Sequence, residues 1–380
     1  MTQTRLKFDR NEFAGSFGDI GTDFPFIVSL ILICRLDPAS VLIMFGLAQV
    51  LTGIIYHLPM PVQPLKAMAA LAITQKLSGD ILYGGGLSVG ILMLFLTMTG
   101  LIQWLARIIP KVVVRGIQLG LGLQLATIAL KDYVPSLGGT GYLLASISFF
   151  IVILLWENRR YPAAIFVIGL GFLYAFLFKV HPNLLTHSVG WHLPQWHTPS
   201  KEDIWTGFLV LALPQIALSL GNSILATRQV IRDFFPERKV TVQKISRTYS
   251  VLNLINPFFS GIPICHGSGG FAGHYMFGAR TGGSVVIYGS MYLLIGLFLS
   301  QGFQEVIQLF PKPILGIILM FEGVALARLT QDLKDSKVDF NVAIITGLMA
   351  VSLPYGYLVG LVVGTLLTYW FNLRGRYEKK

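Results

Sequence analysis

Gly261-Ile-Pro-Ile-Cys-His-Gly-Ser-Gly-Gly-Phe-Ala-Gly-His-Tyr-Met-Phe-Gly278 is the stretch that decides the fold, and it lies between two strongly apolar segments. A proline followed by Gly267, Gly269 and Gly270 is incompatible with the middle of a stable helix. At membrane depth, irregular backbone is tolerated only where it is buried in protein or lines a cavity. A half-helix that begins near Ser268 would direct its first free N–H groups into that cavity. The stretch therefore predicts an anion site.

The composition is that of a polytopic membrane protein. Of the 380 residues, 54% are hydrophobic and 12% are charged, whereas soluble proteins carry about 25% charged residues. The net charge of +11 indicates basic residues in short loops, which set membrane orientation, rather than a nucleic-acid surface. The polar, basic start of the chain predicts no cleavable signal peptide. Cys34 and Cys265 give no disulfide framework.

Apolar runs predict the membrane topology, because a helix that crosses the hydrocarbon core needs about 20 residues. Fourteen spans are expected, at 13–34, 38–57, 60–77, 83–107, 110–130, 142–157, 161–180, 205–228, 247–261, 263–278, 284–303, 311–328, 339–353 and 355–373. With this count and a cytoplasmic N-terminus, every basic cluster falls on the cytoplasmic side. We therefore expect an all-α polytopic protein of the cytoplasmic (inner) membrane, with both termini in the cytoplasm.

The two halves of the chain resemble each other at a nearly constant offset. Three pairs of segments match in the same order, at offsets of 203, 202 and 201 residues: 14–19 (AGSFGD) with 217–222 (ALSLGN), 60–66 (MPVQPLK) with 262–268 (IPICHGS), and 109–114 (IPKVVV) with 310–315 (FPKPIL). Each half holds seven predicted spans, an odd number, so the second half is inverted. We expect inverted repeats at 1–180 and 204–380, the plan of secondary transporters with midplane sites on discontinuous helices.

The third and tenth spans are the discontinuous ones, and they occupy equivalent places in the two repeats. In the third span, Pro61 and Pro64 bracket Gln63, and a helix with free N–H groups follows. Two facing positive helix ends plus the charge of Lys66 predict a seat for a divalent oxyanion. The binding candidates from these spans are Gln63, Lys66, Ala67, His266, Gly267, Ser268, Gly269 and Gly270. The alternatives are snorkelling for Lys66 and a purely conformational role for the glycine loop.

Polar stripes flank this site in the first and eighth spans. Glu12, Ser16, Asp19 and Asp23 follow each other at spacings of 4, 3 and 4, and Gln215, Ser219 and Asn222 at spacings of 4 and 3, so each set would share one helix face. Ionisable groups within spans are costly and usually face a cavity. We expect binding roles for Ser16, Gln215, Ser219 and Asn222, and proton coupling through Asp19, Asp23 or Glu322. Hydrogen bonding between helices is the alternative for the serines and Gln215.

Other classes of function fit the sequence less well. Cys265, His266 and His274 lack a fourth metal ligand and match no zinc spacing. Ser268 lacks the Gly-x-Ser-x-Gly context of a nucleophile elbow. We therefore expect no enzyme, no metal and no cofactor. A passive anion channel and a nucleobase permease of the same fold are the alternatives to an oxyanion transporter.

Five motifs resemble the signature stretches of the molybdate transporter family, which is related to the SulP sulfate permeases: 17–22 (FGDIGT), 60–66 (MPVQPLK), 114–120 (VRGIQLG), 214–222 (PQIALSLGN) and 265–270 (CHGSGG). The resemblance implies a seven-plus-seven fold with a core domain (11–107 and 204–303) and a gate domain (108–180 and 304–375). It also implies a substrate between the third and tenth half-helices, alternating movement of core against gate, and dimerisation as a family habit. The resemblance selects molybdate over sulfate or tungstate.

These observations predict a secondary active transporter that imports a tetrahedral oxyanion by proton symport with alternating access. A dianion that enters against an inside-negative potential pays about 2.3 kcal/mol per charge per 100 mV. Protons that move with it would offset this cost. The expected partners are thus the oxyanion, the proton and the lipid bilayer, with no nucleic acid.

Overall fold

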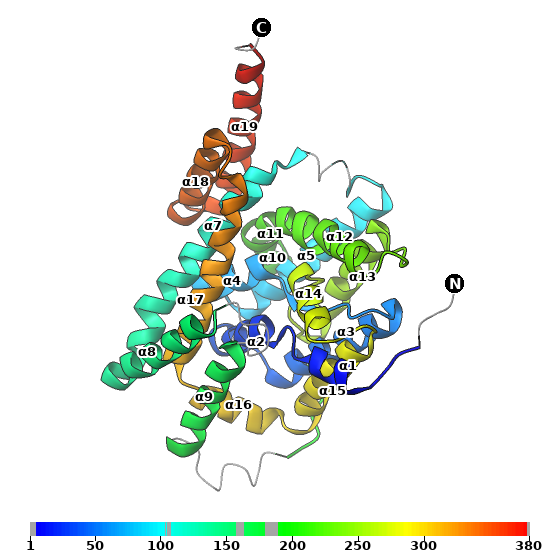
Figure 1. Ribbon diagram of the computed structural model, residues 1–380, viewed down its shortest axis with the longest axis vertical. Helices are drawn as coiled ribbons and strands as arrows, with labels where there is room; N and C mark the ends of the chain where they lie inside the picture. Colours follow the sequence, from blue (N-terminus) through cyan, green and yellow to red (C-terminus); the bar gives the residue numbers. More distant parts are fainter. Residues whose placement is uncertain (1–4, 103, 105–107, 157–162, 179–188, 378–380) are drawn as a thin grey trace.

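The computed structural model describes residues 5–102, 104, 108–156, 163–178 and 189–377 and is predominantly helical (Figure 1). The elements of the first half are α1 (Arg10–Ser16), α2 (Ile20–Cys34), α3 (Pro38–Tyr56), β1 (Gln63–Pro64), α4 (Lys66–Thr74), α5 (Gly79–Met98), α7 (Lys111–Ile128), η1 (Ala129–Tyr133), η2 (Val134–Leu137), α8 (Gly138–Leu154) and α9 (Ala163–Phe178). The all-α prediction is confirmed.

The second half repeats this order of elements. It comprises α10 (Lys201–Gly207), η4 (Phe208–Ala212), α11 (Leu213–Leu218), η5 (Ser219–Ala226), α12 (Thr227–Phe234), α13 (Val242–Ile255), η6 (Asn256–Phe259), β2 (Ile264–Cys265), α14 (Ser268–Met276), α15 (Gly283–Phe298), α16 (Ser300–Leu309), α17 (Lys312–Arg328), η7 (Leu329–Leu333), α18 (Lys337–Ser352) and α19 (Gly356–Tyr377). The short strands β1 and β2 stand where the third and tenth spans were expected to break.

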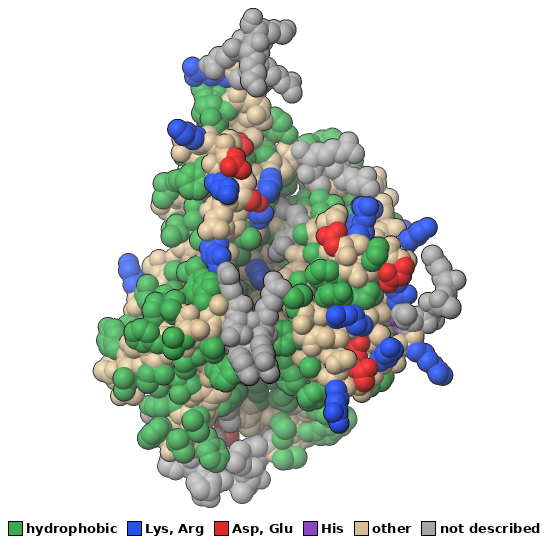
Figure 2. Space-filling view, in the orientation of Figure 1, with side chains coloured by type: hydrophobic (Ala, Val, Ile, Leu, Met, Phe, Trp, Pro, Cys, Tyr) green, Lys and Arg blue, Asp and Glu red, His purple; other side chains and the backbone are tan. Residues whose placement is uncertain are grey.

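Several helices suit a membrane by length and composition. Five helical runs in the described ranges have at least 18 residues and are apolar enough to cross it: Pro38–Tyr56, Gly79–Met98, Lys111–Leu154, Lys312–Leu333 and Gly356–Arg374. In Figure 2, hydrophobic side chains cover the lower left flank, whereas Lys and Arg gather toward the top and right. Such an apolar flank is the surface expected against lipid. The count of fourteen spans stays a prediction.

The prediction of one continuous first helix is wrong. α1 ends at Ser16 and α2 begins at Ile20, with a turn between them. Gly18 in this turn lies against the backbone of α14, where an added Cβ would lie 2.5 Å from the amide nitrogen of His274. Because the break redirects the chain, Glu12 leaves the expected stripe. Its carboxylate instead accepts the N–H groups of Arg280 (2.9 Å), Thr281 (2.7 Å) and Ser284 (3.0 Å) at the start of α15.

The eighth span is one long helical run from α10 to α12, but η4 and η5 within it are π-helical. π-Helical turns are rare and concentrate at functional sites. The 4, 3 spacing that placed Gln215, Ser219 and Asn222 on one α-helical face therefore does not hold beyond Ser219. Gln215 and Ser219 still meet, with the amide Nε2 donating to the hydroxyl oxygen at 3.0 Å.

Helix pairs between the halves follow the repeat. α3 packs along α15, which pairs the second expected span with the eleventh. α5 packs along α13, which pairs the fourth expected span with the ninth. Exchanging the halves converts one pair into the other. In Figure 1, α7, α8, α17, α18 and α19 form a column beside the larger group that contains α3–α5 and α10–α15. We propose that these groups correspond to the gate and core domains.

Two glycines at equivalent positions of the two repeats contact each other within the column formed by α7, α8, α17, α18 and α19. Gly122 of α7 and Gly323 of α17, 201 positions apart, face each other so closely that a Cβ on either would collide with the carbonyl oxygen of the other. Without a hydrophobic force between helices in lipid, small residues permit the close approach that gives tight packing. The contact explains why glycine occupies both positions.

Candidate anion site between two half-helices

The two broken spans cross through a minimal antiparallel ladder. Gln63 pairs with Cys265 and Pro64 with Ile264, and the Leu65 N–H donates to the Pro263 carbonyl at 3.0 Å. β1 leads directly into α4 and β2 into α14, so the two half-helices start at the ladder and run in opposite directions. Two positive helix ends therefore begin close together within buried protein, as the sequence predicted.

Two buried carboxamides complete the hydrogen bonding of this ladder. Gln49 of α3 donates to the Val62 carbonyl (2.8 Å) and accepts the Val62 N–H (3.0 Å). Asn253 of α13 does the same with Ile264, at 2.6 and 2.9 Å. A carboxamide carries a donor and an acceptor side by side, so each one replaces a missing neighbouring strand. Neither residue is among the predicted site residues; the available signal was an amide within an apolar span of each repeat.

The N-terminus of α4 is capped from the eighth span. Gln215 Oε1 accepts the N–H groups of Ala67 (3.0 Å) and Met68 (3.2 Å). The hydroxyl of Ser219, which accepts from Gln215, also lies 2.7 Å from the Tyr249 hydroxyl. Gln215 thus supplies the acceptor that α4 lacks at its own N-cap, Leu65. In this state a neutral group of the protein occupies the α4 end.

The N-terminus of α14 is the more open end. Its N-cap, Gly267, provides no side-chain hydrogen bond. Ser268 is half-buried and Gly269 is exposed, and a methyl group at Gly269 would meet no heavy atom within 4 Å. The first N–H groups of a helix have no partner within the helix. The α14 end therefore has free space on the side of Gly269.

Three charged side chains surround the crossing. Asp19, which precedes α2, accepts from Gln63 Nε2 through both carboxylate oxygens, at 2.7 and 2.6 Å. Asp23 is fully buried farther along α2. Lys66 is the half-buried first residue of α4, and it lies with both aspartates close enough to act electrostatically on the Cys265 thiol. The structure thus brings Gln63, Lys66 and both aspartates together around the ladder.

Other predicted site residues lie elsewhere. His266 is fully buried, with Nε2 at 2.7 Å from the Thr248 hydroxyl and Nδ1 at 3.1 Å from the Pro61 carbonyl. Both ring nitrogens therefore form hydrogen bonds with protein groups beside the crossing of the two half-helices. Ser16 donates to the Phe13 carbonyl within α1 at 2.7 Å. The side chains of Asn222 and Glu322 lie outside the described part of the structure.

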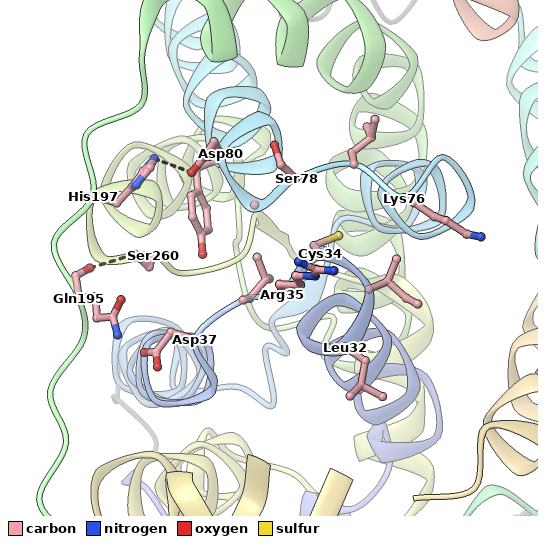
Figure 3. A pocket seen from close by; sticks show the side chains of 15 residues that line it. Leu32, Cys34, Arg35, Asp37, Lys76, Ser78, Asp80, Gln195, His197 and Ser260 are labelled. Carbon is pink, nitrogen blue, oxygen red and sulfur yellow. Dashed lines mark hydrogen bonds and ion pairs between the residues drawn. The ribbon is translucent and has the colours of Figure 1, made fainter. Parts of the chain in front are cut away.

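Two cavities lie apart from the half-helix ends. One, of about 690 Å³, lies where α2 and α4 end and α3 and α5 begin. Figure 3 shows His197 directed at Asp80, at 3.7 Å between Nε2 and Oδ1, and the Ser260 hydroxyl bonded to the Gln195 carbonyl at 3.0 Å. A second cavity of about 460 Å³ lies between Gln75, Pro214 and the α18–α19 turn. By the expected topology, both cavities are on the outer side.

Comparisons with known proteins show the family and the fold of the chain. The family described as "Molybdate transporter of MFS superfamily" matches residues 11–125 and 207–326, more than half of the chain and equivalent parts of the two repeats. Molybdate transporter 2 of Arabidopsis thaliana is 32% identical over 409 residues, which cover 94% of this chain and 87% of that protein.

Solved structures show the same fold at low sequence identity. The transmembrane domain of the cyanobacterial bicarbonate transporter BicA aligns with a TM-score of 0.68 and 13% identity, over 94% of this chain and 96% of that one. The murine Solute Carrier 26 family member A9 anion transporter, in its inward-facing state, aligns with a TM-score of 0.71 and 14% identity, over 99% of this chain and 70% of that one. The chain therefore belongs to the molybdate transporter family and has the transmembrane fold of these anion transporters.

Proposed function

We propose that this protein imports a tetrahedral oxyanion across the cytoplasmic membrane, molybdate first and sulfate or tungstate as rivals. The observation that carries the proposal is the N-terminus of α14, where Gly269, next to Ser268, is exposed and borders free space. Helix N-termini bind oxyanions through backbone N–H groups and a positive dipole end. The family and the names of the relatives favour molybdate, whereas the geometry supports only the anion class.

The seat is asymmetric in this proposal. The N–H groups and hydroxyl at the start of α14 hold the anion, and the ammonium group of Lys66 adds a full positive charge from α4. Gln215 and Ser219 keep the α4 end in place, so they support the site without contacting the anion in this state. His266 has the same supporting role, because both of its ring nitrogens bond to protein groups.

The coupling is proton symport with alternating movement of the core against the gate. The inside-negative potential opposes entry of a dianion by about 2.3 kcal/mol per charge per 100 mV, which favours a coupled transporter over a channel. Asp19 and Glu322 are the candidate proton carriers, and both termini face the cytoplasm. Molybdate uptake into proteoliposomes that ignores an imposed pH gradient would contradict the symport part.

Equilibrium binding of molybdate and sulfate to the purified protein tests the substrate class. We expect micromolar or tighter molybdate binding that is lost in Ser268→Trp, because the indole would fill the space in front of α14. The matched control is Ser136→Trp, at an exposed position of the short helix η2 far along the sequence, which should bind as the wild type does. Absence of binding of either anion would contradict the proposal. Binding of a neutral nucleobase that survives Lys66→Ala would favour the permease alternative.

A further inference from the structure

The carboxylate of Asp19 lies against the first turn of α14, where a bound anion would be stabilised. A Cβ added to Gly270, the third residue of α14, would collide with Asp19 Oδ2 and lie 2.6 Å from the carboxyl carbon. The side chain of Asp19 is 4% exposed. Since the first turn of a helix carries its unsatisfied N–H groups, the protein places its own negative charge at the positive end of α14.

Gln63 holds this carboxylate in place. Its Nε2 donates to both carboxylate oxygens, and its carboxamide is packed on Gly267, where a Cβ would collide with Oε1. Glycines at 267 and 270 thus leave room for the Gln63–Asp19 pair on α14. The three parts of this arrangement come from the α1–α2 turn, β1 and α14, so the repeat crossing itself creates it.

We propose that Asp19 is a resident anion that competes with the substrate for the N-terminus of α14, and that the oxyanion binds when Asp19 takes up a proton. The inference rests on the proposed function and gives its coupling a physical form. Two negative groups on one helix end repel each other, and each disfavours the charged state of the other. Protonation removes the charge of the carboxyl group and weakens its attraction to α14. One proton then enters with each dianion, and one net negative charge moves.

Other titratable groups surround Asp19, and each defines a competing explanation. Among the described residues they are Asp23 on α2, Lys66 on α4, Cys265 on β2, His274 on α14, and Tyr288 and Tyr292 on α15. Lys66 carries the opposite charge and would also attract the substrate. Asp23 is the rival proton carrier, because it is a buried carboxyl group in the first turn of α2, close to Asp19 in the chain.

The test is the pH dependence of molybdate affinity in wild type, Asp19→Asn and Asp23→Asn, over about three pH units. In the wild type, the dissociation constant should rise up to about tenfold per pH unit where free Asp19 is ionised, because one proton binds with the anion. Asp19→Asn should abolish this slope and, at high pH, bind molybdate as tightly as the wild type does at low pH. Asp335→Asn, at an exposed loop position, should keep the wild-type slope.

Two results would overturn the inference: an unchanged slope in Asp19→Asn, or a folded Asp19→Asn protein that no longer binds molybdate. Loss of the slope in Asp23→Asn alone would assign the proton to Asp23 and also refute it. If Asp19→Asn does not fold, the test is the number of protons that the wild-type protein takes up when molybdate is added. About one proton is expected per bound anion. Anion binding without proton uptake refutes this inference alone, whereas absence of anion binding refutes the proposed function and the inference with it.

Discussion

Replacing Asn253 by leucine tests how the two half-helices are held at their crossing. The amide donates to the Ile264 carbonyl and accepts the Ile264 N–H, at 2.6 and 2.9 Å, and all of these atoms are buried. Leucine has a similar size but neither donor nor acceptor, so the N–H and C=O groups of Ile264 lose their partner. Leaving one buried polar group unsatisfied costs about 1–3 kcal/mol in proteins.

The size of the effect follows from two bounds. Two orphaned groups would lower stability by about 2–6 kcal/mol on the soluble-protein scale. Side-chain hydrogen bonds measured between membrane helices average only about 0.6 kcal/mol, with a maximum near 1.7. Because Ile264 is a backbone unit within a two-residue strand, which has few other partners, we expect a loss of about 2–4 kcal/mol, between these bounds.

The assay is reversible unfolding in mixed micelles, with Gln49→Leu as the repeat-related variant and Gln229→Leu as the control. Gln49 makes the equivalent pair of bonds to Val62, so its loss should be similar. Gln229 is exposed and bonds only to Asp233 among the described residues; its replacement should change stability by about 0.5 kcal/mol or less. Stability of Asn253→Leu within this control range would refute the role assigned to the amide.

Three further substitutions have defined outcomes in the same unfolding assay. Gly323→Leu should destabilise by about 1–3 kcal/mol or more, because its side chain meets the backbone of Gly122; wild-type stability would contradict the close helix contact. Gln215→Leu should destabilise by about 1–3 kcal/mol, since the Ala67 and Met68 N–H groups lose their acceptor; an unchanged midpoint would contradict the capping role. Glu12→Ala should cost about 0.5–2 kcal/mol through the uncapped start of α15, and no change would show that water replaces the carboxylate there.

The helix breaks at the crossing of the two half-helices could be predicted from the sequence. Proline and glycine interrupt apolar runs at Pro61, Pro64 and Gly267, and the offset between the halves placed both breaks at equivalent positions. These signals are local, because a proline or a glycine pair disfavours a helix whatever surrounds it. The matching Pro110 and Pro311 are the N-caps of α7 and α17, at the positions where the fifth and twelfth spans were expected to begin.

Tertiary contacts decided what the sequence could not show. The break after Ser16 follows from the contact between Gly18 and α14. The glycines at 15, 18 and 21 do not by themselves indicate where a helix would break, because helices tolerate single glycines. The π-helical turn η5 altered the register of a stripe that α-helical spacing had aligned. The clamping role of Gln49 and Asn253 could not be predicted from their apolar spans, because their partners are backbone groups that only the fold brings near.

The central claim is that the anion binds at the start of α14, and anomalous X-ray scattering at the molybdenum edge tests it most directly. In crystals grown with molybdate, we predict an anomalous peak within hydrogen-bonding reach of the backbone N–H groups of Ser268 and Gly269. A peak only in the cavity bordered by Arg35, Lys76 and His197, or no peak in protein that binds molybdate, would contradict the account.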